Sequence, residues 1–209
     1  MKLLHPTYIP NIAFFSVLLS GKITWEVFDN YQKQTFRNRA HICTDRGLHV
    51  LSIPITHTKD KSGRQSYQNV KVDNTYPWQR QHWRTLETAY RTSPFFEYYE
   101  DDIRPLYDTK EYHLMAFNIK TIETVCQCLQ VELSANKTSE YIRTPKDMED
   151  FRFLANAKTK LNFKGSEYVQ VFGDRHGFIP NLSILDLLFN LGPETITYLK
   201  NVVLDTNHD

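Results

Sequence analysis

The sequence predicts an α/β fold in which a mixed sheet is flanked by helices. Short apolar or alternating segments typical of strands recur along the first half, and longer segments with helical spacing dominate the second half. A chain of 209 residues is long enough for one sizeable core. No internal repeat, low-complexity tract or break in composition divides it. We therefore expect a single domain over residues 1–209.

The first elements are predicted to be strand, turn, helix and strand. Lys2–Leu4 is a short apolar strand, and His5–Pro10 is a turn that contains two prolines. Asn11 is placed to cap a helix that ends at Ser20-Gly21. Apolar and polar residues then alternate over Ile23–Phe28, which predicts a second strand.

A strand pair and a polar loop follow. Ala40–Cys43 and Leu48–Ile55 lie on either side of the turn Thr44–Gly47, which predicts a hairpin. Thr56–Gln68 is polar and charged, so we expect a mobile loop there. Val70–Val72 is predicted to be a short strand.

The second half is predicted to be more helical. Pro77 occupies the first position of a helix in which Trp78, His82, Leu86 and Tyr90 share one face. The further predicted elements are helices over 98–107, 113–129 and 145–157 and strands over 131–133 and 168–172.

The most distinctive segment is Leu182–Asn190. Six of its nine residues are large and apolar, and Gly192-Pro193 follows it, so we predict a buried helix. Its polar residues share one helical face and are Ser183, Asp186 and Asn190. A buried acid is costly unless it is paired. We therefore expect a cation of the segment Lys33–Arg39 to pair with Asp186. The three polar residues would then position the residues that bind substrate without contacting substrate themselves.

The composition excludes several classes of protein. The net charge of +1 gives no electrostatic basis for binding nucleic acid. The sequence shows no signal peptide and no apolar run as long as a membrane span, so we expect a cytoplasmic protein. The three cysteines and eight histidines lack disulfide or metal-ligand spacing, and the seven glycines form no dinucleotide or phosphate loop. We expect neither a metal nor a cofactor.

Several motifs occur in a characteristic order along the chain. They are His5-Pro6-Thr7-Tyr8-Ile9-Pro10, Asp29 with Lys33 and Arg37-Asn38-Arg39, Ser52-Ile53-Pro54, Trp78 with His82, Tyr90 with Pro94-Phe95-Phe96, and Tyr168 with Gln170 and Phe178–Asn190. In this order the chain resembles the WbqC-like protein family, from its first residues to Pro193. The family's opening motif begins with glutamine, where this chain has His5.

The resemblance implies a role in the biosynthesis of bacterial surface polysaccharide, such as the O-antigen of lipopolysaccharide. In that setting we expect a transferase that moves an acyl or aminoacyl group from a donor or carrier to an amino sugar or nucleotide-sugar. Two alternatives stay open. One is a non-catalytic module that binds a nucleotide-sugar or carrier, and the other is a nucleotidylyltransferase-like enzyme.

The charged segment Lys33–Arg39 is the first candidate for substrate binding. If it is extended, Lys33, Arg37 and Arg39 share a face, and arginine binds carboxylate or phosphate through two hydrogen bonds. We expect Lys33, Arg37 and Asn38 to hold an anionic donor. In the alternative, one arginine only pairs with Asp186 and the other cations are solvated.

The candidate catalytic residues are Asp29, His82 and His5. Asp29 and His5 each follow a predicted strand, and ligands of open α/β sheets bind at the carboxyl ends of the strands. His82 is either a general base or a hydrogen-bonded core histidine. The residues expected to stack on or hydrogen-bond the acceptor are Tyr8, Tyr168 and Gln170.

Overall fold

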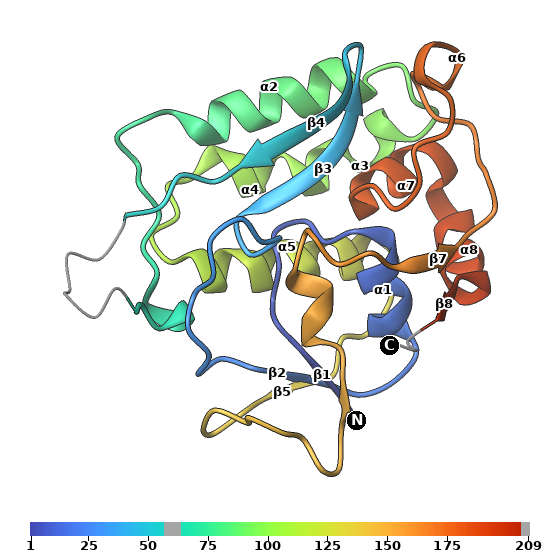
Figure 1. Ribbon diagram of the computed structural model, residues 1–209. Coiled ribbons are helices and arrows are strands. Elements are labelled where there is room, and N and C mark those ends of the chain that lie inside the picture. Colours follow the sequence, from blue (N-terminus) through green and yellow to red (C-terminus); the bar gives the residue numbers. More distant parts are fainter. Residues whose placement is uncertain (57–63, 206–209) are drawn as a thin grey trace.

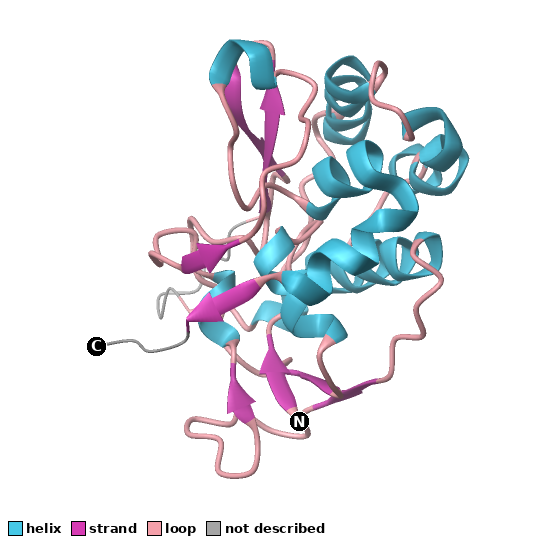
Figure 2. Cartoon of the chain, turned by 90° about the vertical axis from the view of Figure 1, so that its right-hand side faces the viewer, coloured by secondary structure: helices cyan, strands magenta, loops and turns pink. Residues whose placement is uncertain are grey.

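A four-stranded parallel sheet forms one end of the molecule. The computed structural model describes residues 1–56 and 64–205 (Figure 1). The sheet consists of β1 (Lys2–Leu4), β2 (Ile23–Trp25), β5 (Ala135–Lys137) and β6 (Glu149–Asp150), in the order β5-β2-β1-β6. Each neighbouring pair is parallel. The view turned by 90° shows these strands near the N-terminus, with most helices beyond them (Figure 2).

Two antiparallel pairs lie outside this sheet. β3 (Arg39–Thr44) and β4 (Gly47–Ser52) form the predicted hairpin, and Gly47 has the positive φ of +89° that a tight turn favours. β7 (Asn162–Lys164) pairs with β8 (Val203–Asp205) near the end of the described chain. The α/β class is therefore confirmed, and the antiparallel strands are separate from the parallel sheet.

Helices of varied length cover the sheet and fill the rest of the molecule. They are α1 (Ile12–Leu19), α2 (Trp78–Tyr90), α3 (Phe96–Ile103), α4 (Pro105–Asp108), α5 (Leu114–Cys128), α6 (Gly173–His176), α7 (Ile184–Leu191) and α8 (Thr195–Asn201). Single 3₁₀ turns lie at Tyr67–Asn69, Arg152–Ala155 and Gly192–Glu194. The helices that the sequence predicts within 12–19, 78–90, 98–107, 113–129 and 182–190 are all present, with bounds shifted by a few residues.

The helices α1 and α7 are joined at their N-terminal ends. Asn11 caps α1 by accepting a hydrogen bond from the Phe14 amide at 3.0 Å. Ser183 caps α7 and donates its hydroxyl proton to the Ile9 carbonyl at 2.9 Å. Residues 184–190 of α7 are all buried, as their apolar composition predicts. This junction fixes the turn after β1, from which His5 projects.

The structure corrects the predictions for several short segments. Residues 145–157 form β6 and a 3₁₀ turn instead of a helix, because β6 supplies backbone hydrogen bonds to the free edge of β1. Residues 131–133 form no strand, and the strand lies at β5 instead. Residues 168–172 have no regular structure, and 70–72 make isolated bridges. Most of the predicted loop 56–68 lies outside the described residues.

Candidate functional site

The carboxyl edge of the parallel sheet gathers polar side chains from four strands. In chain order the strands are arranged third, second, first, fourth, so the order reverses beside β1. Open α/β sheets bind ligands at such a reversal. A cavity of about 380 Å³ opens here. Its lining residues are His5, Asp29, Gln32, Arg37, Tyr141, Asp150, Arg152, Phe153 and Asn156.

Three of the predicted site residues meet at this cavity, and we call them the His5 cluster: His5, Asp29 and Arg37. One oxygen of Asp29, Oδ2, lies 3.1 Å from His5 Nε2 and 3.2 Å from Arg37 Nη2. The His5 and Arg37 side chains are each 3% exposed, whereas that of Asp29 is 14% exposed. Asp29 is therefore the member of the cluster that faces solvent most openly.

Burial sets the protonation of this cluster. It lowers the pKa of His5, and the hydrogen bond that His5 donates to Asp29 offsets that effect only in part. Burial also opposes ionisation of Asp29, but the hydrogen bond with His5 and the charge of Arg37 bring its pKa below the usual range. Asp29 is thus a carboxylate at neutral pH, beside a histidine that is biased toward its neutral form.

The backbone of Arg37 is anchored, but its guanidinium makes few hydrogen bonds. Its carbonyl accepts a hydrogen bond from Asn118 Nδ2 at 2.6 Å, and its guanidinium lies 5.4 Å from the centroid of the Tyr67 ring. Among the described residues, the guanidinium hydrogen-bonds to Asp29 alone, and its buried Nε has no partner. A buried guanidinium with unused donors is suited to bind an anionic group of a ligand.

A second charged group, which was not predicted from the sequence, lies beside the first. We call Glu26, Asp150 and Arg152 the Glu26 cluster. Arg152 Nη2 lies 2.7 Å from Asp150 Oδ2, and Arg152 Nη1 lies 3.6 Å from Glu26 Oε2. Glu26 is fully buried and directly follows β2, so a charged residue at the end of an apolar strand was an available signal. Asp150 and Arg152 were missed because their segment was predicted to be helical.

Tyr8 and His82 lie together, but not at the cavity. The Tyr8 hydroxyl is 2.8 Å from His82 Nδ1 and 2.9 Å from the Tyr107 hydroxyl. Tyr8 is fully buried and His82 is 6% exposed. Burial lowers the pKa of His82 to about 4, so it is neutral at pH 7. The structure therefore favours the core-histidine alternative for His82 and gives Tyr8 a packing role.

Asp186 forms a third polar group, with Tyr168 and Gln170. Its Oδ2 accepts hydrogen bonds from the Tyr168 hydroxyl at 2.6 Å and from Gln170 Nε2 at 3.0 Å. The prediction that a cation of Lys33–Arg39 pairs with Asp186 is wrong, because Arg37 pairs with Asp29 and no described residue forms an ion pair with Asp186. Neutral donors therefore bond one oxygen of this acid, its buried Oδ1 has no partner among the described residues, and burial raises its pKa.

The remaining predicted residues have separate positions. Lys33 is exposed and does not line the cavity, because the chain around it turns instead of extending. Asn38 is buried and donates to the Ile53 carbonyl at 2.9 Å, which joins its segment to the end of the hairpin. Ser183 caps α7, and Asn190 donates to the Asp186 carbonyl at 2.7 Å within the same helix.

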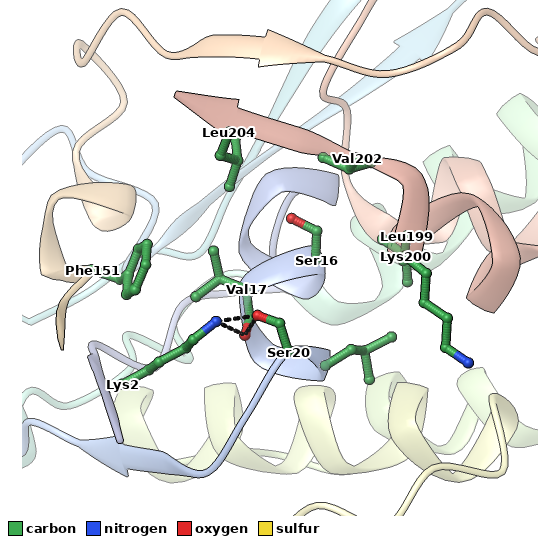
Figure 3. Close-up of a pocket in the computed structure, with 10 residues that line it drawn as sticks. Lys2, Ser16, Val17, Ser20, Phe151, Leu199, Lys200, Val202 and Leu204 are labelled. Atoms are coloured by element: carbon green, nitrogen blue, oxygen red, sulfur yellow. Dashed lines mark hydrogen bonds between the residues drawn. The ribbon is translucent and has the colours of Figure 1, made fainter. Parts of the chain in front are cut away.

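A cavity of about 400 Å³ elsewhere offers less chemistry (Figure 3). Residues of α1, α8 and β8 line it together with Lys2 and Phe151. Lys2 donates to Val17 O at 3.5 Å and to the Ser20 hydroxyl. Its ammonium group therefore lies at the C-terminal end of α1, where the helix dipole favours a positive charge. None of the predicted site residues lines this cavity.

The described part of the chain contains no cluster of three or more residues that is suited to hold a metal ion. Across those same residues, no helix is both long and apolar enough to cross a bilayer.

The sheet order and the polar carboxyl edge place this protein among the open α/β proteins with a crevice at the strand reversal. The chain belongs to the WbqC-like protein family, which matches residues 5–162 and 145–198. It is similar to an uncharacterized protein of Mycobacterium tuberculosis, Rv1507c, with 29% identity over 231 aligned positions that cover 95% of this chain and 96% of the relative. No solved structure matches the chain significantly.

Proposed function

We propose that this protein is an enzyme of bacterial surface-polysaccharide biosynthesis that transfers an acyl or aminoacyl group to an amino sugar or nucleotide-sugar. One observation carries the proposal: one oxygen of the Asp29 carboxylate contacts both His5 and the poorly paired Arg37 in the lining of the cavity. An acid–base pair beside an anion-binding arginine is what acyl transfer to the amine of a charged sugar needs. The family resemblance supports the setting.

In this scheme Arg37 binds an anionic group of the substrate and so fixes its orientation. The amine attacks the carbonyl of the acyl donor, a C–N bond forms, and the donor's leaving group departs with its electron pair. Asp29, the most exposed member of the His5 cluster, takes the proton that the amine loses. His5 donates its Nε2–H to Asp29 Oδ2, because a carboxylate only accepts, and so orients Asp29 for this step. The proposal gives His82 no part, because that side chain is bonded within the core.

The experiment is a reconstituted transfer assay with nucleotide-linked amino sugars and acyl thioesters. We expect Asp29→Asn and Arg37→Ala each to lower kcat/KM by about 100-fold or more, in the range of a lost acid–base group or charged contact. Lys33→Ala is the matched control, since Lys33 is a cation of the same motif that does not line the cavity. Full activity of both Asp29→Asn and Arg37→Ala would show the scheme to be wrong.

A non-catalytic binding module is the second candidate. The cavity is lined by no serine, cysteine or lysine among the described residues, so three common types of covalent nucleophile are missing there. Tight binding of nucleotide-sugars without turnover by any donor would favour this candidate. Release of pyrophosphate that depends on a divalent metal would instead indicate nucleotidylyl transfer.

A further inference from the structure

The segment 138–143, which follows β5, is tied to the Glu26 cluster on both sides of Tyr141. Glu26 accepts hydrogen bonds from the Thr138 hydroxyl at 3.1 Å and from the Ile142 amide at 3.0 Å. Arg152 donates to the Ile142 carbonyl at 2.5 Å and to the Arg143 carbonyl at 3.2 Å. A segment without helix or strand structure is thereby fixed by charge-assisted hydrogen bonds.

Arg152 has little capacity left for a ligand. Its Nε and Nη2 donate to the two oxygens of Asp150 at 2.9 and 2.7 Å, and Nη1 is engaged by Ile142 and Glu26. Arg37, in contrast, hydrogen-bonds to one described side chain and has a buried Nε without a partner. The two cavity arginines therefore differ in role: Arg37 is available to an anion, and Arg152 holds the protein together.

The result of this anchoring is a tyrosine ring held at the cavity. Tyr141 is 49% exposed although its neighbours are fixed, and it lines the same cavity as Arg37. The Arg152 guanidinium carbon lies 5.8 Å from the centroid of the Tyr141 ring. This cation–π contact helps to fix the orientation of the ring. A fixed and partly exposed aromatic face is a surface on which a nucleobase can stack.

We infer that Tyr141 is the stacking surface for the base of a nucleotide whose phosphates bind Arg37, and that Arg152 is the residue that positions Tyr141. The inference rests on the proposed function, because it takes the same cavity as the active site. It narrows the substrate to a nucleoside diphosphate derivative and excludes a simple sugar phosphate.

The test is calorimetric titration of the full chain with UDP, dTDP, CDP and GDP and with inorganic pyrophosphate. The wild type should bind at least one nucleotide more tightly than pyrophosphate. Tyr141→Ala should weaken that nucleotide by about tenfold, which corresponds to the loss of one stacked base, and leave pyrophosphate unchanged. Tyr141→Phe should retain the wild-type affinity. Tyr112→Ala, which removes an exposed tyrosine away from the cavity, is the control and should change neither ligand.

The positioning role of Arg152 has its own readout. Arg152→Lys keeps the charge but cannot form the paired hydrogen bonds to Asp150. It should reproduce the selective loss of nucleotide affinity, and hydrogen exchange of the amides in 138–143 should become faster. Unchanged exchange together with unchanged nucleotide affinity would contradict this role.

The outcomes separate the inference from the proposed function. If Arg37→Ala abolishes binding of both nucleotide and pyrophosphate while Tyr141→Ala changes neither, the stacking inference is overturned and the anion site stands. Wild-type protein that binds no nucleotide more tightly than pyrophosphate would likewise overturn the stacking inference. If neither ligand binds in a way that depends on Arg37, the proposed function and the inference both fail.

Discussion

The protonation of His5 and Asp29 is mutually dependent. Burial and the charge of Arg37 favour the neutral imidazole, whereas Asp29 favours the imidazolium through a 3.1 Å contact. The net pKa of His5 lies below its ordinary value of 6.5. A change in the charge of Asp29 or of Arg37 should therefore shift the pKa of His5.

Asp29→Asn should lower the pKa of His5 further. The substitution removes the negative charge that stabilises the imidazolium but leaves burial and Arg37 in place. The measurement is an NMR titration of the His5 ring protons, assigned by comparison with His5→Gln. Arg37→Ala is the complementary variant and should raise the same pKa. A higher His5 pKa in Asp29→Asn would contradict the electrostatics described for this cluster.

Asp186 gives a second test at the scale of single residues, through stability. Burial raises its pKa above the ordinary value of 3.8, and the hydrogen bonds from Tyr168 and Gln170 oppose that shift. The Tyr90 hydroxyl lies near the carboxyl but outside direct hydrogen-bond geometry. Because the folded pKa is the higher one, the stabilising contribution of the protonated acid is complete below pH 3.8 and is lost as the pH rises through the folded value.

The stability of Asp186→Asn relative to wild type should therefore increase as the pH rises above about 4. Asparagine keeps an acceptor for Tyr168 and Gln170 and adds no charge. Asp186→Ala leaves both donors unsatisfied and should cost roughly 1–3 kcal/mol relative to Asp186→Asn. Urea denaturation at several pH values measures both differences. A difference between wild type and Asp186→Asn that stays constant with pH would rule out a raised pKa.

Among individual residues, the sequence was most informative where a polar side chain follows a strand. His5 and Asp29 were predicted from that position, and Arg37 from the charge of its motif; all three line the cavity. Asp186 was predicted to have a cationic partner, because the sequence does not show that the neutral donors Tyr168 and Gln170 reach one oxygen of its carboxyl. Those donors come from an irregular segment whose path no local pattern specifies.

At the scale of elements, α7 ends at a glycine that both the backbone conformation and the packing require. Gly192 has a φ of +53°, a conformation that other residues rarely adopt. A Cβ at this position would lie 2.5 Å from Cδ1 of the Phe95 ring. The turn after α7 and the packing of this turn on the start of α3 therefore both depend on the absence of a Cβ at Gly192.

Gly192→Ala should destabilise the fold by roughly 1–3 kcal/mol through strain and overpacking. Gly173→Ala is the control, because a Cβ at Gly173 would meet nothing within 4 Å. It should change the free energy of unfolding by no more than about 0.5 kcal/mol. Thermal or urea denaturation of the two variants compares them directly. Equal stability of both variants would mean that neither the positive φ of Gly192 nor its approach to Phe95 disfavours a side chain there.

The elements that the sequence predicted correctly share strong local signals. The helix α1 has a capping asparagine, α7 has an apolar face bounded by Pro180 and Gly192, and the β3–β4 hairpin has an evident turn. The strands β5 and β6 have no such signal and were missed. Each has three residues or fewer, and pairing with a distant strand determines its conformation.

At the scale of the whole molecule, the candidate site is a product of the sheet order. His5, Glu26, Thr138 and Asp150 come from widely separated parts of the chain and meet because their strands run parallel. The sequence could indicate two of these strand ends but not that the fourth strand returns beside the first. The sequence therefore could not predict that Tyr141 and Arg152 lie close together, because the tertiary structure alone brings both to one cavity.

The position of β1 between β2 and β6 has a consequence for the way the chain matures. The first strand gains one neighbour early, at residues 23–25, but its other edge stays unpaired until residues 149–150 exist. Such long-range closure is slow compared with local helix formation. During synthesis, helices α1 to α5 can assemble before β6 and the residues after it, which complete the lining of the cavity, have been made. Binding competence should thus be a late property of a nascent chain, acquired only after residues 149–156 have reached the edge of the sheet.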